Sequence, residues 1–240
     1  AALDVEELLG AEIKPEPRLG EHPVGAGEGQ LHGTGLANIV ALCDTDMGAP
    51  HTQKILKQFP NVPRFQDFRK MFDEIEKQID AVVVCPPSGL TATVATAVIA
   101  AGKHLLCEKP LGLTYADARA LQTAAESADI VHMVAFTFRF VPALRYLKRL
   151  VAEGHFGEIR HWRLSYFTDF MLDPATPVAW RNQRTQAGAG ILADMGSHGI
   201  DFARYLLGDI AAVSGVSRVY VRERPSAAAG GAFVPVDADD

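Results

Sequence analysis

The chain has 240 residues, of which 48% are hydrophobic and 22% are charged, and its formal net charge at pH 7 is −6. This composition is typical of a globular protein, and the acidic balance argues against a nucleic-acid-binding surface. No apolar run reaches the roughly 18 residues that a membrane-spanning helix needs. The acidic start, Ala1 to Gly10, lacks the basic and apolar regions of a signal peptide. We therefore expect neither nucleic acid nor a membrane as a partner.

The three cysteines indicate a reducing environment. Cys43, Cys85 and Cys107 are odd in number, and each follows an apolar run that is typical of a strand. Buried reduced thiols fit this pattern better than disulfides do. We therefore expect a cytoplasmic protein.

The first part of the chain carries a weak dinucleotide-binding signal. Gly25, Gly27 and Gly29 form a glycine-rich segment, and Asp44 follows it at the end of a predicted strand over residues 38–44. A dinucleotide-binding fold needs glycines for close approach to the pyrophosphate and an acid for the ribose hydroxyls. The segment is one residue short of the regular fingerprint between its second and third glycines. A flexible loop for the glycines, and a turn or helix-capping acid at Asp44, are the alternatives.

The next hundred residues alternate between helical and strand patterns. This alternation predicts a parallel sheet covered by helices on both faces, and hence a Rossmann-like α/β domain over residues 1–137. Ligands of such sheets bind at the carboxyl ends of the strands, so residues at these ends are expected to share one edge. They are Asp44, Pro86, Pro87, Glu108 and Lys109. The expected helices are 51–59, 68–77, 91–101 and 114–128, and the expected strands after Asp44 are 79–85, 103–107 and 130–136.

The pattern changes after Phe138, where we predict a second domain over residues 138–240. Helices are expected at 142–153 and 191–207, and strands at 158–170 and 212–222. A loop over 172–190 lies between the first strand and the second helix, and a flexible Ala/Gly segment over 226–231 follows the last strand. Two strands make only a thin sheet, so the sequence predicts an incomplete α+β open-sheet domain.

Lys109 is the first catalytic candidate. It lies between Glu108 and Pro110 at the end of a predicted strand, and the proline disfavours helical backbone at Lys109. A lysine fixed at this place can exchange a proton with a substrate hydroxyl. The alternative is a solvated surface lysine.

Asp194 and His198 form a second group of candidates. They are four residues apart and therefore share one helical face, and Asp201 could orient the imidazole. A carboxylate and an imidazole at a helix start suit hydroxyl binding and proton transfer. The alternatives are a helix-dipole acid beside an incidental histidine, and a zinc site. The zinc site lacks evident third and fourth ligands, so we expect no metal.

Arginine and tryptophan in loops provide weaker candidates. Arg139, Trp180 and Arg181 can bind a cofactor amide or a polar substrate, although such residues are as often found in interfaces or at the surface. The candidate cofactor-binding residues are Gly25, Gly27, Gly29, Asp44, Pro86, Pro87, Glu108, Lys109, Arg139, Trp180 and Arg181.

Several motifs together resemble the glucose–fructose oxidoreductase/inositol dehydrogenase (Gfo/Idh/MocA) family. The Glu108-Lys109-Pro110 motif is joined to the Asp194-x-x-x-His198 helix, and each motif alone is less specific than the two together. The resemblance runs from about residue 38 to residue 240. Its motifs cover residues 41–44, 82–87, 101–110, 136–140 and 190–198.

The resemblance implies an NAD(P)-dependent dehydrogenase with an N-terminal Rossmann domain. It implies that Lys109 is catalytic, that Asp194 and His198 handle a hydroxylated substrate such as a sugar or polyol, and that Asp44 holds the adenosine ribose. An acid at Asp44 favours NAD over NADP. The C-terminal sheet is then expected to bind substrate and to form a homo-oligomer. A non-catalytic binding or assembly protein that keeps the same fold, and a hydrolase or lyase that uses the same lysine and histidine, are the alternatives.

Overall fold

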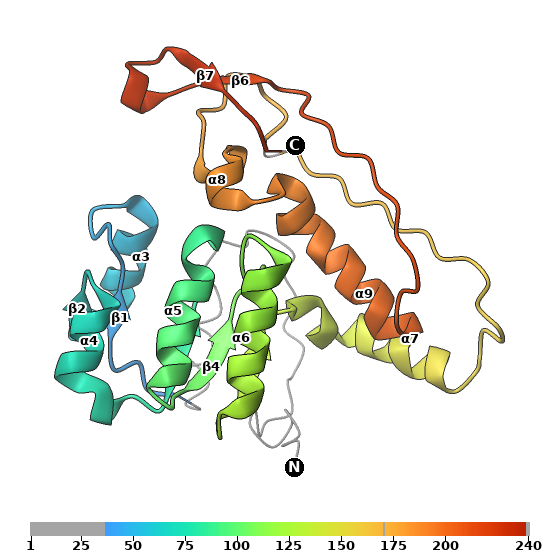
Figure 1. Ribbon diagram of the computed structural model, residues 1–240, viewed down its shortest axis with the longest axis horizontal. Coiled ribbons are helices and arrows are strands. Elements are labelled where there is room, and N and C mark those ends of the chain that lie inside the picture. Colours follow the sequence, from blue (N-terminus) through green and yellow to red (C-terminus); the bar gives the residue numbers. More distant parts are fainter. Residues whose placement is uncertain (1–36, 170, 239–240) are drawn as a thin grey trace.

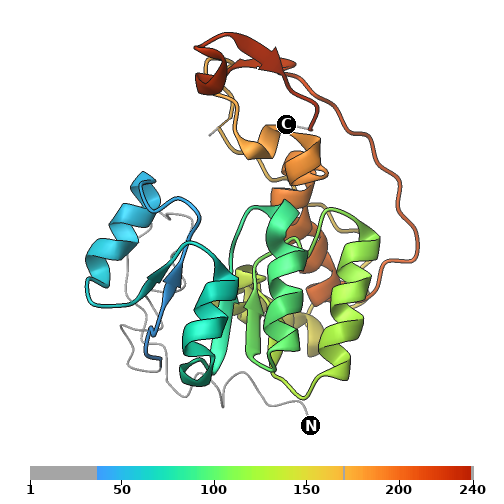
Figure 2. The same ribbon diagram turned by 60° about the vertical axis from the view of Figure 1, so that its left-hand side comes forward.

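A parallel sheet forms the centre of the first half of the chain (Figures 1 and 2). The computed structural model describes residues 37–169 and 171–238. Strands β3 (Ala81–Val84), β4 (His104–Cys107) and β5 (His132–Val134) pair in this order, and all are parallel. Val84 is paired with Cys107, and Cys107 with Val134, so the three strands end at the same edge.

Helices α5 (Ser88–Ala100) and α6 (Tyr115–Ser127) lie side by side over this sheet in both views (Figures 1 and 2). Burial of apolar side chains between the helices and the strands stabilises the layer. The buried residues of this core are Val84, Ala95, Val98, Ile99, Leu105, Cys107, Leu121 and Ala125.

The predicted boundaries of both helices have local causes. Gly102 has a positive φ of 66° just after α5, a conformation that glycine adopts without steric cost. Thr114 and Asp117 form the predicted capping box at the start of α6, with Thr114 Oγ1 accepting a hydrogen bond from the Asp117 amide at 3.2 Å. Helix α5 begins at Ser88, three residues before the predicted start.

A second pair of strands lies next to the first helices of the described chain. Strands β1 (Leu42–Cys43) and β2 (Arg64–Phe65) are parallel, and helices α3 (Pro50–Gln58) and α4 (Phe68–Ile75) lie beside them (Figure 1). A 3₁₀ turn, η1 (Glu76–Gln78), follows α4. Within the described residues, these two strands form a separate sheet from β3–β5.

Helices and extended segments make up the second half of the chain. A 3₁₀ turn η2 (Thr137–Phe140) leads into α7 (Pro142–Ala152). Further along, a 3₁₀ turn η3 (Trp180–Asn182) and helix α8 (Arg184–Ala187) precede a π-helical turn η4 (Leu192–Gly196), which continues into α9 (Ser197–Leu207). The predicted helices over 142–153 and 191–207 are thus present, the second with a π-helical first part.

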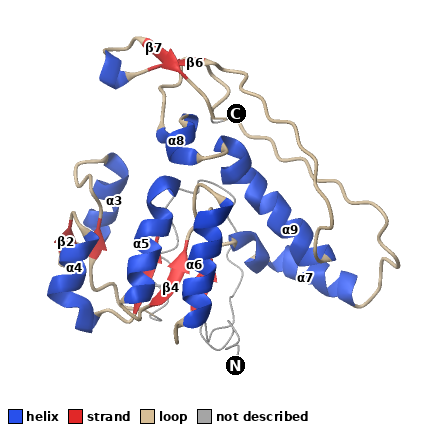
Figure 3. Ribbon diagram, in the orientation of Figure 1, coloured by secondary structure: helices blue, strands red, loops and turns tan. Residues whose placement is uncertain are grey.

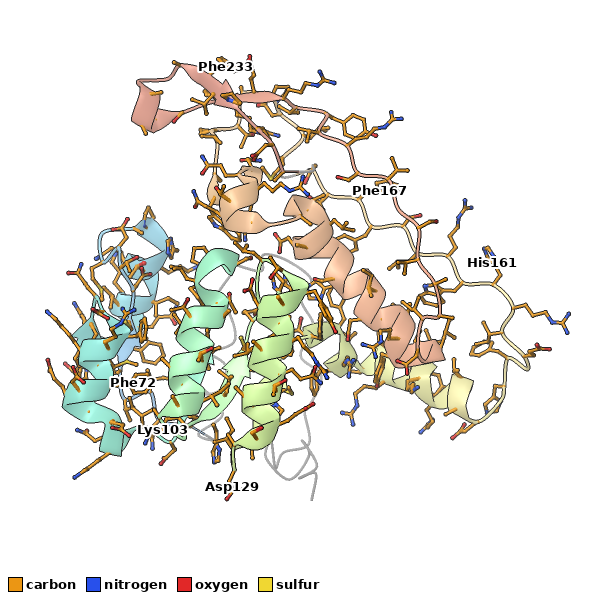
Figure 4. The ribbon with its side chains drawn as sticks, in the orientation of Figure 1. Phe72, Lys103, Asp129, His161, Phe167 and Phe233 are labelled. Atoms are coloured by element: carbon orange, nitrogen blue, oxygen red, sulfur yellow. The ribbon has the colours of Figure 1, made fainter. Side chains whose placement is uncertain are left out.

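The strands that we predicted at 158–170 and 212–222 are wrong for the described residues. Residues 158–169 and 212–222 are extended but have no strand assignment, and Figure 3 draws them as long loops. A strand needs a ladder of hydrogen bonds to a neighbouring strand, and none of the strand pairings among the residues that the structure describes includes these segments. Their apolar side chains are correspondingly exposed: Phe167 is 92% exposed and Val216 is 88% exposed, and Figure 4 shows Phe167 and His161 on one of these loops.

A short hairpin encloses the segment 226–231, which we predicted to be flexible. Strands β6 (Glu223–Pro225) and β7 (Phe233–Pro235) are antiparallel, and the 3₁₀ turn η5 (Ala227–Ala229) connects them. Gly230 and Gly231, with φ of 63° and 90°, close the turn at low steric cost. The composition of 226–231 favours a loop, but the paired strands on either side make it the tip of a hairpin.

The described part of the chain contains neither a membrane-spanning helix nor a group of side chains that could hold a metal ion. No helix in it is long and apolar enough to cross a membrane. Nor do its side chains form a group of three or more histidine, cysteine or acidic residues that could hold a metal ion.

Candidate active site

Lys109 lies at the carboxyl end of β4, where the sequence analysis expected it. The Glu108 amide donates to the Val84 carbonyl at 2.8 Å, which holds this end of β4 against β3. The peptide bond between Lys109 and Pro110 is cis. The Lys109 side chain is only 13% exposed, so the alternative of a solvated surface lysine is wrong.

A carboxylate from the second half of the chain meets this lysine. Lys109 Nζ donates to Asp194 Oδ1 at 2.5 Å and to the Asp194 backbone carbonyl at 2.8 Å. Asp194 Oδ2 accepts a second bond, at 2.8 Å, from Nε of Arg181. One carboxylate, only 18% exposed, therefore holds two cations that come from different segments.

The pKa values of Asp194 and Glu108 are shifted in opposite directions from their ordinary values. Burial raises the pKa of Asp194, but the hydrogen bonds from Lys109 and Arg181 outweigh it, and the pKa lies below its ordinary value. For Glu108, burial raises the pKa above its ordinary value, although the charge of Lys109 partly opposes this. Asp194 is therefore held as a carboxylate, whereas Glu108 is the more readily protonated acid.

His198 lies in an aromatic environment next to this network. Its ring centroid is 4.6 Å from that of Phe138 and 6.0 Å from that of Phe136, with the second pair edge to face. Its Nδ1 is buried, and within the described residues it has no hydrogen-bond partner. Burial and the charge of Lys109 both lower the pKa of His198, while Asp194 and Asp201 oppose the shift. The imidazole is therefore neutral over a wider pH range than an exposed histidine.

This lowered pKa predicts a pH-dependent stability. The unfolded chain binds a proton at His198 first when the pH falls below about 6.5, so acidification through this range favours unfolding. A His198→Gln variant lacks this group and is expected to lose less unfolding free energy between about pH 7 and about pH 5. Urea denaturation of both proteins at several pH values measures the difference. Parallel pH profiles for the two proteins would contradict the prediction.

The predicted role of Asp201 is wrong. Its carboxylate does not orient the imidazole but pairs with Arg139, whose Nε donates to Oδ2 at 2.9 Å and whose Nη2 donates to Oδ1 at 2.5 Å. Two N–H donors of the planar guanidinium match the two carboxylate oxygens. Such a bidentate pair is stronger than a single hydrogen bond from the imidazole to the carboxylate. Arg139 also packs against Tyr205, with its Cζ 5.3 Å from the ring centroid. Whether Arg139 binds a cofactor stays a prediction.

Asp44 lies at the carboxyl end of β1 and is held by its own loop and by α3. Its Oδ1 accepts from the Asp46 amide at 2.9 Å, and its Oδ2 accepts from Thr52 Oγ1 at 2.6 Å. His51 Nε2 lies 3.6 Å from the same Oδ2. These contacts match the alternative of a turn acid, and they also fix the direction of a carboxylate that remains partly exposed. Three predicted residues, Gly25, Gly27 and Gly29, lie outside the described residues.

Three further predicted residues, Pro86, Pro87 and Trp180, lie near members of the Lys109 network, which consists of Lys109, Asp194 and Arg181 with His198 beside them. Pro86 and Pro87 follow β3 at the same sheet edge as Glu108, and Pro87 is the N-cap of α5. Trp180 packs against its neighbour Arg181, with the guanidinium carbon 4.4 Å from the ring centroid. The structure thus brings Lys109, Arg181 and Asp194 together by direct bonds.

Two residues that contact the predicted site residues are not among the sequence-based candidates. Phe138 stacks on the imidazole of His198, and buried Thr52 bonds Asp44. The available signal for Phe138 is the aromatic-rich segment 136–140, which is one of the motifs of the family resemblance. Thr52 follows Asp44 by eight residues, across a loop and the start of α3, and this spacing carries no signal of its own.

Two protein-family models match the chain. Residues 23–136 match the model described as "Oxidoreductase family, NAD-binding Rossmann fold". Residues 144–240 match the model described as "GFO/IDH/MocA C-terminal domain". The two models follow one another in the chain and between them include all the residues of the Lys109 network.

Curated relatives carry the names of sugar dehydrogenases. Levoglucosan dehydrogenase of Pseudarthrobacter phenanthrenivorans is 39% identical over 185 residues, which are 72% of this chain and 47% of that protein. D-apiose dehydrogenase of Paraburkholderia graminis is 32% identical over 174 residues, which are 72% of this chain and 44% of that protein. The chain therefore spans about half the length of these relatives.

Solved structures agree with this assignment. A structure of levoglucosan dehydrogenase in complex with NADH superposes with a TM-score of 0.76 at 35% identity, covering 84% of this chain and 52% of that one. An oxidoreductase domain protein from Kribbella flavida gives a TM-score of 0.75 at 37% identity, covering 85% and 53%. The sequence motifs, the fold and both family models agree, and the chain belongs to the Gfo/Idh/MocA oxidoreductase family.

Proposed function

We propose that this chain is an NAD-dependent oxidoreductase that moves a hydride between the nicotinamide and a hydroxyl-bearing carbon of a sugar or polyol. The observation that carries the proposal is the bonding of Lys109 Nζ to Asp194, with the imidazole of His198 beside it. A lysine and a neutral histidine at the carboxyl edge of a parallel sheet are suited to moving a hydroxyl proton.

Each side chain of this network has a distinct role in the proposal. Lys109 takes or gives the proton of the substrate hydroxyl through Nζ. Asp194 fixes the direction of that ammonium by accepting two of its hydrogen bonds, and Arg181 keeps Asp194 ionised. His198 has a buried Nδ1 without a partner among the described residues, and in the proposal this atom binds a second substrate hydroxyl or receives the proton from Lys109. Holding these groups in one geometry lowers the entropic cost of the reaction.

The residues present fit a dinucleotide at two places. Asp44 accepts one hydrogen bond at each carboxylate oxygen, so each oxygen keeps a lone pair for a ribose hydroxyl. Pro86, Pro87 and Glu108 supply the sheet edge over which the rest of the cofactor is expected to lie. When bound, the oxidised nicotinamide supplies the hydride acceptor that the amino acids lack. A carboxylate at Asp44 disfavours the 2′-phosphate of NADP, so NAD is the proposed cofactor.

The substrate class follows from the polar groups of the network. Lys109, His198 and Asp194 together offer donors and acceptors to neighbouring hydroxyls, which suits a polyhydroxylated compound. The names of the two relatives, both sugar dehydrogenases, support the same class. We further propose a cytoplasmic homo-oligomer formed through the C-terminal part, with the domain boundary between residues 137 and 138.

The test is cofactor binding followed by turnover. Titration of the purified chain with NAD and with NADP is expected to show tighter binding of NAD. Addition of candidate sugars and polyols is then expected to form NADH in proportion to oxidised product. An Asp44→Asn variant is expected to bind NAD about 10-fold more weakly, because it loses a charged hydrogen-bond acceptor for the ribose, and to lose its discrimination against NADP.

The outcomes separate the alternatives. Binding of neither cofactor favours the non-catalytic binding or assembly protein. Product formation without any change in nicotinamide absorbance favours a hydrolase or lyase. Unchanged NAD affinity in Asp44→Asn would leave Asp44 as the turn acid that its contacts with Asp46 and Thr52 also allow.

A further inference from the structure

Arg224 is a fully buried cation whose bonding partners are backbone carbonyls. The side chain is 0% exposed. Nη2 donates to the Met171 carbonyl at 2.6 Å, and Nη1 donates to the carbonyls of Asp173 at 2.9 Å and Thr176 at 3.4 Å. Nε is buried and has no partner within the described residues. Burying a guanidinium in this way is costly, so the contacts that it makes must be important for the local structure.

The three carbonyls belong to one stretch, residues 171–184, which we call the site loop because it carries Trp180 and Arg181. The segment 223–238, which contains the β6–β7 hairpin, we call the hairpin frame. Arg224, near the start of the hairpin frame, closes the first part of the site loop around its guanidinium. The planar, forked donor group reaches three acceptors at once, which a single ammonium does with difficulty.

The rest of the hairpin frame holds the second part of the site loop. The Val178 amide donates to the Pro225 carbonyl at 2.8 Å. The amides of Asp237 and Ala238 donate to the carbonyl of buried Asn182, at 3.3 Å and 3.2 Å. The Arg184 amide donates to Asp237 Oδ1 at 2.7 Å. Trp180 and Arg181 therefore lie between attachments on both sides.

Arg181 connects the site loop and the hairpin frame to the candidate active site. Its backbone is fixed by the hairpin frame, and its Nε donates to Asp194 Oδ2 at 2.8 Å. Asp194 in turn accepts from Lys109 Nζ through its other oxygen. A continuous series of bonds thus leads from Arg224, about 115 positions along the chain from Lys109, to the proposed catalytic lysine.

We propose that Arg224 is a positioning residue, which orders the site loop so that Arg181 reaches Asp194 and thereby sets the direction of Lys109. The proposal rests on the proposed function for its catalytic meaning, but the bond that it predicts between the ordered loop and Asp194 exists without cofactor or substrate. Arg224 touches neither Lys109 nor Asp194, so its effect passes through Arg181.

The first experiment measures loop order without any ligand. In a Trp162→Phe background Trp180 is the single tryptophan, and acrylamide quenching of its fluorescence reports its accessibility. Arg224→Met is expected to raise the quenching constant about twofold or more. Arg224→Lys, which keeps the charge but not the fork, is expected to be intermediate. The matched control Arg222→Met changes an exposed arginine two residues away and is expected to leave the quenching unchanged.

The second experiment follows Asp194 by carboxyl NMR titration in the full chain. Arg181→Met is expected to raise the pKa of Asp194, because one of its two cationic donors is lost. Arg224→Met is expected to raise it in the same direction, and to add nothing in the Arg181→Met background. An additive effect, or no effect of Arg224→Met in an Arg181-containing chain, would overturn the proposal.

Two further outcomes distinguish the positioning role of Arg224 from a general effect on folding and from the proposed dehydrogenase function. If both Arg224→Met and Arg224→Lys lose the helical circular-dichroism signal, Arg224 supports the whole fold, and the positioning role is overturned. If loop order and the Asp194 pKa respond as expected but NAD does not bind, the positioning role holds and the proposed dehydrogenase function fails. The two ideas are therefore tested separately.

Discussion

Replacing Lys109 with alanine is expected to lower the rate of hydride transfer about 10²- to 10⁴-fold, the range typical of a lost general acid–base group. Affinity for NAD is expected to change little, because the cofactor contacts that we propose at Asp44 and at the β3 edge do not involve the Lys109 ammonium. Single-turnover measurements of nicotinamide absorbance give the rate, and a separate titration gives the affinity. Asp194 remains ionised in this variant because Arg181 still pairs with it.

The matched control is Lys103→Ala. Lys103 precedes β4 at the opposite end of the strand from Lys109, and Figure 4 shows it at the far end of the sheet from α8 and α9. Its replacement is expected to leave both rate and affinity unchanged. Full activity of Lys109→Ala would refute the catalytic role, whereas an equal loss in both lysine variants would point to a general effect on the sheet.

Replacing Asp194 with alanine is expected to destabilise the fold by about 3 kcal/mol, because two largely buried cations lose their shared counter-charge. Lys109 Nζ would keep only the backbone carbonyl, and Arg181 Nε would lose its acceptor. Asp194→Asn is expected to destabilise less, since the amide oxygen still accepts one hydrogen bond. Urea unfolding of the wild type and of both variants measures the difference.

An exposed ion pair provides the comparison for this prediction. Asp209 pairs with Arg204 at 2.7 Å, but its side chain is 89% exposed. Water screens such a pair, so Asp209→Ala is expected to leave the unfolding free energy unchanged within error. If Asp194→Ala were as stable as Asp209→Ala, the network around Lys109 would contribute little to the connection between the two halves of the chain.

The sheet edge was predictable because its signals are local. Apolar runs that end in Pro86-Pro87 and in Glu108-Lys109 mark two adjacent strand ends, and the direction of parallel strands places them at one edge. The bond between Lys109 and Asp194 joins residues 85 positions apart. No periodicity encodes such a contact, and only the joint occurrence of the two motifs suggested it.

The failures have a common physical cause. The segments 158–169 and 212–222 have side chains that favour strands, but strand formation depends on a partner, which a local pattern does not specify. Asp201 was assigned to His198 by helical spacing, whereas the better partner, Arg139, comes from another part of the chain. The segment 226–231, predicted as flexible from its composition, is the tip of a hairpin whose first strand carries Arg224 and is bonded to the site loop.

The π-helical turn at Leu192–Gly196 makes the site depend on the number of residues and not only on their identity. Such a turn contains one residue more than a regular helical turn, and here its Asp194 carbonyl accepts bonds from the side chains of Lys109 and Ser197. Loss of one residue would restore regular winding and rotate the turn by about 100° relative to α9. Asp194 and His198 would then no longer face Lys109 together. Deletion of one residue from this turn is therefore expected to separate the two halves of the site.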